Sequence, residues 1–350
     1  MVVAPTTRSE RIGLEMDEVA GMPQMQKANL LRAGPNTAID EIDVRLIRLL
    51  QSDGRMSFVA LANDLQLAEK TVRKRIADLR STGCMDITVV TDPRSIGYHS
   101  IAMVGVKVDQ GTSRNELAER LFELEVVDYA VTALGAYDIL VELVCHDDSE
   151  LATQIDNGLR KIAGIRDLEV FPYLRLHYQQ PAWDRAQDKP NKGNVPPKYN
   201  LDPVDLSIIR LLSEDGRKPF LEIARLLEVS ESQIRNRYSR LVDDGTLQVL
   251  AITNPKILGY ALSAWVSVRV SANRSITEVA DILAGFSSVA YLAICAGRYD
   301  IMMEVICVDR DDLYALLDNK IRKVDGISSI ETFICSDFLY RKLVMPRTQK

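Results

Sequence analysis

Residues 39–83 read IDEIDVRLIRLLQSDGRMSFVALANDLQLAEKTVRKRIADLRSTG, and residues 201–245 read LDPVDLSIIRLLSEDGRKPFLEIARLLEVSESQIRNRYSRLVDDG. A shift of 162 positions aligns the two stretches, so that the Asp-Gly-Arg motif at 53–55 meets the same motif at 215–217. A missed repeat would give the wrong fold, so internal repeats are sought first. Chance does not match glycine and arginine positions over such a length. The chain is therefore predicted to be an internal duplication.

The register continues without a gap to a Gly-x-Tyr-Asp motif at 135–138, which meets the same motif at 297–300. A unit of about 135 residues is longer than a solenoid repeat and is typical of a whole module. A segment rich in Pro, Lys, Asn and Gly separates the copies and is predicted to be a linker. The predicted division is a disordered tail (1–38), a helix-turn-helix domain (39–98), a ferredoxin-like effector and oligomerisation domain (99–178), the linker (179–200), a second helix-turn-helix domain (201–260), a second ferredoxin-like domain (261–342) and a tail (343–350).

The composition fits an ordinary globular protein, with 47% hydrophobic and 26% charged residues in 350. The net charge of −6 excludes a globally basic nucleic-acid coat protein but not a local basic patch. The start of the chain lacks the apolar core of a signal peptide, and no apolar run is long enough for a membrane span. Five cysteines without a CxxC pair and three separated histidines predict a cytoplasmic protein with free thiols, no metal site and no cofactor.

Each copy begins with three predicted helices, which in the first copy cover 39–53, 58–66 and 69–83. Their apolar residues recur at helical spacing, and Asp40 or Asp43 favours the start of the first helix. The third helix is basic: from 69 to 80 it carries five Lys and Arg against two Asp and Glu. A short helix followed by a longer basic helix is typical of a helix-turn-helix that binds DNA.

The second half of each copy changes from helical periodicity to the alternation of β-strands. The order of predicted elements is βαββαβ, the ferredoxin-like arrangement, with a continuous second helix expected over 149–163 in the first copy. Between the halves, the β-rich runs at 85–90 and 247–253 are expected to form a small wing or hairpin. The predicted fold class is therefore α+β, a duplicated winged or plain helix-turn-helix domain followed by a ferredoxin-like ligand-sensing domain.

The order of domains and three motifs resemble the Lrp/AsnC family of feast/famine transcription regulators, in a tandem form with two family protomers in one chain. The motifs are D-x-x-D/G-R after the first helix, V-x-x-R-I-x-x-L-x-x-x-G on the third helix and G-x-Y-D in the second domain. The resemblance covers about residues 40–176 and 202–340. It implies a sequence-specific regulator, not an enzyme, whose partners are double-stranded DNA and a small effector, an amino acid by analogy with the family.

The predicted recognition helices supply the candidate DNA contacts, since arginine pairs with guanine and Asn or Gln with adenine. For Lys70 and Lys74 the alternative is a solvated helix face. For Arg75 and Arg237 it is an ion pair that braces the domain through an aspartate of the first helix. The candidates are Lys70, Thr71, Arg73, Lys74 and Arg75 in the first copy and Ser232, Gln233, Arg235, Asn236 and Arg237 in the second.

The two recognition helices are expected to differ. Ser230 and Gln233 form a predicted capping box at the second helix, whereas Ala68 occupies the cap position of the first, where the family usually has serine. The second helix carries the weaker outward charge. We therefore expect an asymmetric pair of half-sites or one dominant recognition helix.

The resemblance places an amino-acid effector near the G-x-Y-D turn, at an interface between ferredoxin-like domains. A glycine turn exposes backbone N–H groups that can hold a carboxylate, and an aspartate can hold an ammonium group. The alternative is that the glycines only make a hairpin turn that the aspartates complete. The candidate residues are Gly135, Ala136, Tyr137 and Asp138 with Gly297, Arg298, Tyr299 and Asp300, and the Ala136/Arg298 difference predicts unequal pockets.

The two ferredoxin-like domains are expected to pair within the chain as a pseudo-dimer, and further association of chains is plausible because closed symmetric assembly is the rule for homo-oligomers. Two alternatives remain open. Siroheme decarboxylases resemble the same fold, but they would need a cluster of His, Arg and Tyr, whereas His99, His146 and His177 lie in separate segments. The other alternative is an amino-acid sensor whose helix-turn-helix domains no longer bind DNA.

Overall fold

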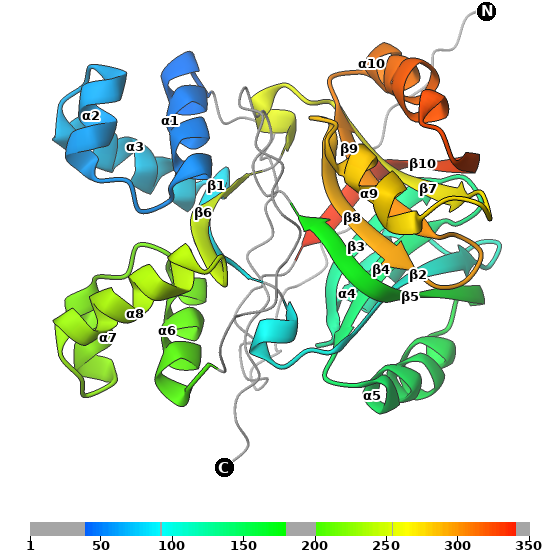
Figure 1. The fold of residues 1–350 in the computed structure, drawn as a ribbon, viewed down its shortest axis with the longest axis horizontal. Coiled ribbons are helices and arrows are strands. Elements are labelled where there is room, and N and C mark those ends of the chain that lie inside the picture. Colours follow the sequence, from blue (N-terminus) through cyan, green and yellow to red (C-terminus); the bar gives the residue numbers. More distant parts are fainter. Residues whose placement is uncertain (1–38, 92, 180–200, 254, 341–350) are drawn as a thin grey trace, which may run out of the picture.

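The computed structural model describes residues 39–91, 93–179, 201–253 and 255–340. The predicted tails and nearly all of the predicted linker lie outside this part. We call residues 39–178 copy 1 and residues 201–342 copy 2. Figure 1 shows the helical domains of both copies on one side of the molecule and a β-barrel on the other. None of the described helices is long and apolar enough to cross a membrane.

The three predicted helices are present in each copy. Asp40 caps the first helix of copy 1 in a reciprocal capping box with Asp43, and both residues are ones that the sequence offers as favouring the helix start. Ser230 and Gln233 form the predicted capping box of α8, whereas Ala68 gives α3 no side-chain cap. The helices are α1 (Glu41–Ser52), α2 (Phe58–Leu65) and α3 (Glu69–Ser81) in copy 1, and α6 (Pro203–Glu214), α7 (Phe220–Leu226) and α8 (Glu231–Asp243) in copy 2.

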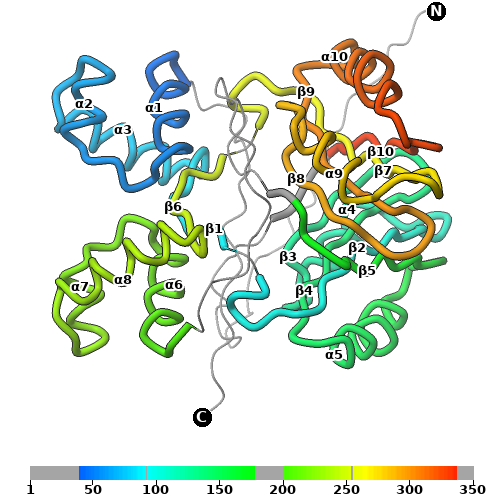
Figure 2. The backbone as a smooth tube through the Cα atoms, viewed as in Figure 1, coloured from blue at the N-terminus to red at the C-terminus, as the bar shows by residue number. Residues whose placement is uncertain are grey.

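The predicted wing or hairpin within each copy is wrong. Strand β1 (Met85–Thr91) of copy 1 pairs antiparallel with β6 (Leu247–Thr253) of copy 2, and the two form a sheet of their own between the helical domains (Figure 2). Each run supplies only one strand, so a hairpin needs a second strand, and the other copy provides it. One continuous apolar core then joins the helices of both copies.

The Asp-Gly-Arg motif forms a turn, which we call the DGR turn, that docks against this two-stranded sheet. The Gly54 N–H donates to the Val249 carbonyl of the other copy at 2.8 Å, and the Gly216 N–H donates to the Ile87 carbonyl at 2.9 Å. A side chain at Gly54 would lie 2.7 Å from the backbone of Leu250, so this close approach requires glycine. The repeated glycines therefore belong to the contact between copies.

The ferredoxin-like units of both copies close into one eight-stranded barrel, in the order β10-β3-β4-β2-β5-β8-β9-β7. The last strand of each copy pairs with a strand of the other copy, β5 with β8 and β10 with β3, which confirms the predicted internal pairing. The elements are β2 (Ser100–Val108), α4 (Arg114–Phe122), β3 (Val127–Leu134), β4 (Ile139–Cys145), α5 (Asp148–Thr153) and β5 (Ile165–Gln179), then β7 (Leu262–Val270), α9 (Ile276–Ala284), β8 (Val289–Cys295), β9 (Ile301–Cys307), α10 (Arg310–Ala315) and β10 (Ile327–Tyr340).

The helix expected over 149–163 is not continuous. An α-helical turn is followed by a π turn at Gln154–Gly158 and a 3-10 turn at Leu159–Lys161. The same break occurs in copy 2, where Lys320 replaces Gly158, so glycine does not cause it. Leu159 follows the π turn and is fully buried, which ties the break to packing against the sheet.

Candidate DNA interface and effector turn

The outward face of each recognition helix is exposed, whereas Val72, Ile76 and Leu79 of α3 are buried as predicted. The apolar stripe faces the core shared by both helical domains, so the opposite face of each helix lies on the surface. Each helix thus presents the predicted candidates to solvent. The exposed candidates are Lys70, Thr71, Arg73 and Lys74 on α3 and Ser232, Gln233, Arg235 and Asn236 on α8.

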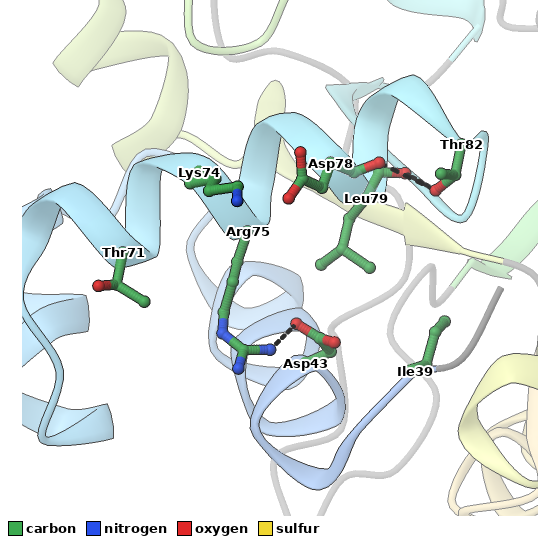
Figure 3. A pocket seen from close by; sticks show the side chains of 8 residues that line it. All are labelled: Ile39, Asp43, Thr71, Lys74, Arg75, Asp78, Leu79 and Thr82. Atoms are coloured by element: carbon green, nitrogen blue, oxygen red, sulfur yellow. Dashed lines mark hydrogen bonds and ion pairs between the residues drawn. The ribbon is translucent and has the colours of Figure 1, made fainter.

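Arg75 turns away from this face toward α1. Its guanidinium pairs with Asp43 at 2.8 Å (Figure 3). It also pairs with Asp40, at 2.8 Å. Lys74 and Thr71 line the same pocket as Arg75, and Figure 3 shows no hydrogen bond or ion pair from either side chain. These hydrogen bonds raise the pKa of Arg75 and hold the pKa of Asp40 below its usual range, the latter chiefly through the backbone N–H of Asp43. The structure thus favours the bracing alternative over DNA contact for Arg75.

Copy 2 repeats this brace with one more arginine. Arg237 pairs with Asp202 at 2.6 Å and with Asp205 at 2.8 Å. Arg240 reaches Asp205 at 2.7 Å, and only 1% of the Asp205 side chain is exposed. Position 78, which corresponds to Arg240, holds Asp78 in copy 1, so the two braces have different strength.

The DGR turns hold the two helical domains together. Arg55 donates to the carbonyls of Gly216 and Lys218, at 2.6 and 3.2 Å. Arg217 donates to Gly54 and Met56 of the other copy, at 2.7 and 2.9 Å. Burial lowers the pKa of both guanidinium groups, which remain charged at neutral pH. The motif was recognised in the sequence as a repeat, but its role in pairing the copies was not.

The G-x-Y-D turns lie where the copies meet. A side chain at Gly135 (φ +148°) would lie 2.8 Å from the ring of Phe333 in copy 2. Gly297 (φ +124°) faces Phe171 of copy 1 in the same way, at 3.6 Å. The structure therefore brings each turn to an interface between ferredoxin-like domains, where the family resemblance expects an effector.

The aspartates of these turns already have protein partners. Asp138 accepts the Val108 N–H at 2.9 Å and pairs with Arg114 at 2.9 Å. Asp300 accepts the Val270 N–H at 2.8 Å. This geometry favours the structural alternative for the aspartates, so that an ammonium group would have to compete with these contacts.

Two polar clusters accompany the turns. Tyr137, which is 2% exposed, donates to Glu169, and Arg298 of copy 2 pairs with the same carboxylate at 3.0 Å. Tyr299 donates to Glu331 in the corresponding place. Burial, followed by the bonded carboxylate, raises the pKa of both tyrosines, so they act as neutral donors. Sequence analysis missed Glu169 and Glu331, although they recur in the 162-residue register.

A second pair of acids lies inside the barrel. Glu142 accepts hydrogen bonds from Tyr173 at 2.7 Å and from Tyr291 of copy 2 at 2.8 Å. Glu304 accepts from Ser263 at 2.9 Å and from Tyr129 of copy 1 at 3.2 Å. Burial raises the pKa of Glu142 and raises that of Glu304 to about 7. The signal in the sequence was one repeated Glu within each of two apolar strands.

The fold and these sites define a class: a duplicated helix-turn-helix protein whose two ligand-domain units share one barrel. Family models agree with this class. The AsnC-type helix-turn-helix domain matches residues 39–80 and 201–242, and the Lrp/AsnC ligand binding domain matches 101–183 and 263–343. The chain belongs to the Lrp/AsnC family of transcription regulators and carries both family domains twice.

Relatives match one copy at a time. An uncharacterized HTH-type transcriptional regulator of Pyrococcus horikoshii is 39% identical over 138 residues, which cover 39% of this chain and 87% of that protein. The HTH-type transcriptional regulator LrpA of the same organism is 35% identical over 144 residues, 41% of this chain and 99% of LrpA. Each is about as long as one copy, which agrees with the duplication.

A solved structure matches the chain as a whole. The siroheme decarboxylase NirDL aligns over 87% of this chain and 94% of its own, with a TM-score of 0.57 and 20% identity. At this identity the likeness shows the shared fold alone. Two of the three histidines lie close together, since the His99 N–H donates to the His146 carbonyl at 3.1 Å and the Tyr98 and His146 rings are 4.8 Å apart. His146 pairs with Glu150, His177 pairs with Asp281, and His99 is exposed at the start of β2.

Proposed function

We propose that this chain binds double-stranded DNA in the cytoplasm as a sequence-specific regulator, with α3 and α8 as the two recognition helices of one internal pair. The exposed residues of these helices, Arg73 and Arg235 above all, would contact the bases, and Arg75 and Arg237 would hold the helices in place. A single chain then presents the two readers that a family dimer would supply. The observation that carries the proposal is the joint core and two-stranded sheet that fix both exposed helices in one unit.

The test is selection of bound fragments from genomic DNA at near-physiological salt. Wild type is compared with the double variant Arg73→Ala/Arg235→Ala. The matched control is Arg160→Ala/Arg322→Ala, which removes the same charge from exposed equivalent positions of the ferredoxin-like units. We expect discrete sites with wild type and control, and their loss in the first variant. Equal enrichment by all three proteins, or no enrichment by wild type, would contradict the proposal.

We further propose that a small effector, of the amino-acid class, binds at the G-x-Y-D turns and modulates DNA binding or assembly. What supports this is the position of both turns against the other copy, since a ligand there can shift the contact between copies. Arg298 offers a cation for a carboxylate, which would compete with Glu169 at 3.0 Å, and Ala136 offers none at the corresponding place. The two turns are therefore expected to bind with unequal affinity.

The effector proposal is tested by thermal unfolding with each common amino acid in turn. We expect a rise in melting temperature with one or a few of them, because a ligand that binds only the folded state stabilises it. The rise should shrink in Arg298→Ala and persist in the control Arg322→Ala. No rise with any amino acid would contradict the assignment of the ligand class.

We propose that one chain already contains the complete pair of recognition helices. Any association of whole chains would then join such complete pairs. Both the sheet between the helical domains and the barrel draw their strands from the two copies, so neither needs a second chain. Light scattering of the purified protein measures its mass directly. A monomer that binds a selected site at full affinity would show that the internal pair is sufficient.

A further inference from the structure

An aromatic ring lies between two arginines in each helical domain. In copy 1, the guanidinium carbon of Arg73 is 3.7 Å from the centre of the Phe58 ring, and that of Arg217 from copy 2 is 4.4 Å away. In copy 2, the Phe220 ring has Arg55 of copy 1 at 4.2 Å and Arg235 at 5.2 Å. Each ring thus contacts one arginine of its own recognition helix and one arginine of the other copy's DGR turn.

The DGR arginine is the fixed member of this arrangement. Arg217 is held by two backbone carbonyls of copy 1 and is largely buried, while Arg73 is 56% exposed. Phe58 begins α2 and packs against the shared core. A guanidinium over an aromatic face is attracted by the ring quadrupole, more strongly where water is partly excluded. The ring therefore links an exposed arginine of the recognition helix to the contact between the copies.

The two copies hold their exposed arginines differently. Arg73 lies close to the Phe58 ring. Its ion pair with Glu69 is weak, because the two groups are 3.6 Å apart. Arg235 lies farther from its ring and makes a 2.5 Å contact with Glu231. Contact with a base needs a guanidinium whose donors are not bonded to a neighbouring carboxylate. Arg73 meets this condition better than Arg235.

We propose that Phe58 is a positioning residue for DNA recognition, which holds Arg73 ready for a base and ties its position to copy 2 through Arg217. Phe220 does this less for Arg235, so copy 1 supplies the stricter of the two recognition helices. This inference rests on the proposed DNA binding. Its physical basis is preorganisation, because a long side chain held in its bound position loses less conformational entropy when DNA binds.

The experiment measures equilibrium binding to a selected site and to its single-base variants at one salt concentration. Phe58→Leu keeps an apolar side chain but removes the ring, and Phe58→Tyr keeps the ring. Phe220→Leu makes the same change in copy 2. We expect Phe58→Leu to lose about fivefold of the discrimination at one half-site, with binding to random DNA unchanged, as expected for an exposed cation–π contact. Phe58→Tyr should restore discrimination, and Phe220→Leu should change it less than twofold.

The outcomes separate the two proposals. If wild type selects no sites, the proposed DNA binding fails and the positioning role falls with it. If wild type selects sites and Phe58→Leu discriminates as wild type does, or Phe58→Tyr fails as Phe58→Leu does, only the positioning role is overturned. Melting temperatures show whether Phe58→Leu is folded, and should it be unstable, Phe58→Met makes the same test with an unbranched side chain that lacks a ring.

Discussion

The recognition helix of copy 1 presents Lys70 and Lys74 where that of copy 2 presents Ser232 and Asn236. Several contacts that stabilise the fold are instead repeated. Each half has one DGR turn, one aspartate–arginine brace and one glutamate inside the barrel. The internal pair constrains the DGR turn in both copies, because each copy is the other's packing partner. Exposed residues of the recognition helices are free of this constraint, and there the two halves differ in charge.

This comparison separates the positions that stabilise the internal pair from those that would set the choice of ligand. Stability of the pair depends on positions where a substitution in one copy meets the backbone of the other. Under the proposed function, the choice of DNA and of effector would depend on positions such as 74 and 236, or 136 and 298, where the side chains differ in charge. The predictions that follow test this division, first at the contacts that the copies share.

Substitution of the DGR glycines should have the largest effect. The new Cβ of Gly54→Ala would lie 2.7 Å from the Leu250 backbone, and that of Gly216→Ala 2.8 Å from the Ile87 carbonyl. Each substitution is expected to cost about 3 kcal/mol of unfolding free energy, the upper range for overpacking. Urea unfolding measures the loss. The control is Gly285→Ala, whose Cβ would lie farther from its nearest neighbours, the Ile282 and Asp281 carbonyl oxygens at 3.2 and 3.8 Å. A large loss of unfolding free energy in only one of the two variants would show that the two DGR turns do not stabilise the pair equally.

The next effect concerns pH and tests Glu304, the acid that copy 2 places inside the barrel. Because the pKa of Glu304 is raised to about 7, its neutral form favours the folded state. Its contribution is present below the unfolded pKa and is lost as pH rises from about 4.5 to 7, on the order of 2 kcal/mol. Glu304→Gln should flatten this part of the stability profile. The exposed Glu116→Gln should leave it unchanged, and a profile of Glu304→Gln parallel to wild type would contradict the assignment.

The braces should break unequally. Arg75→Ala leaves Asp43, whose side chain is 12% exposed, without its arginine and is expected to cost about 2 kcal/mol. Arg237→Ala should cost about half as much, since Arg240 still contacts Asp205 at 2.7 Å. Removal of both Arg237 and Arg240 should restore the larger loss. Equal losses in the two single variants, measured by urea unfolding, would mean that Arg240 adds nothing.

Much of this architecture could be predicted from the sequence because the same pattern of apolar, glycine and arginine positions occurs in both copies. The helices of the first domain, the βαββαβ order of elements in each copy and the difference in caps follow from periodicity and local hydrogen-bonding rules. The pairing of β1 with β6 could not be predicted, since the sequence of a single strand does not specify which other strand it pairs with. The role of Arg55 could not be predicted for the same reason: its acceptors lie about 160 residues away in sequence. In the candidate sites, the outward positions of the recognition helices were predicted to be exposed. The partners from the other copy, such as Phe333 beside Gly135, were not predicted.

The smallest effect concerns the caps and sharpens the comparison most directly. Ala68→Ser should give α3 the side-chain acceptor that Ser230 gives α8, and should raise the unfolding free energy by about 1 kcal/mol. Ser230→Ala should lower it by a similar amount. The control is Ala77→Ser in the exposed middle of α3, where the backbone N–H groups are already bonded and serine is slightly unfavourable.

The sign of the Ala68→Ser effect decides what the missing cap means. A gain of stability with DNA binding unchanged would show that copy 1 lacks the cap without functional consequence. A gain of stability with weaker DNA binding would show that the uncapped start of α3 contributes to the interface, since a serine hydroxyl would then compete for the same N–H groups. No gain at all would contradict the argument that the two recognition helices differ in local stability. Their asymmetry would then lie only in the charges that they present.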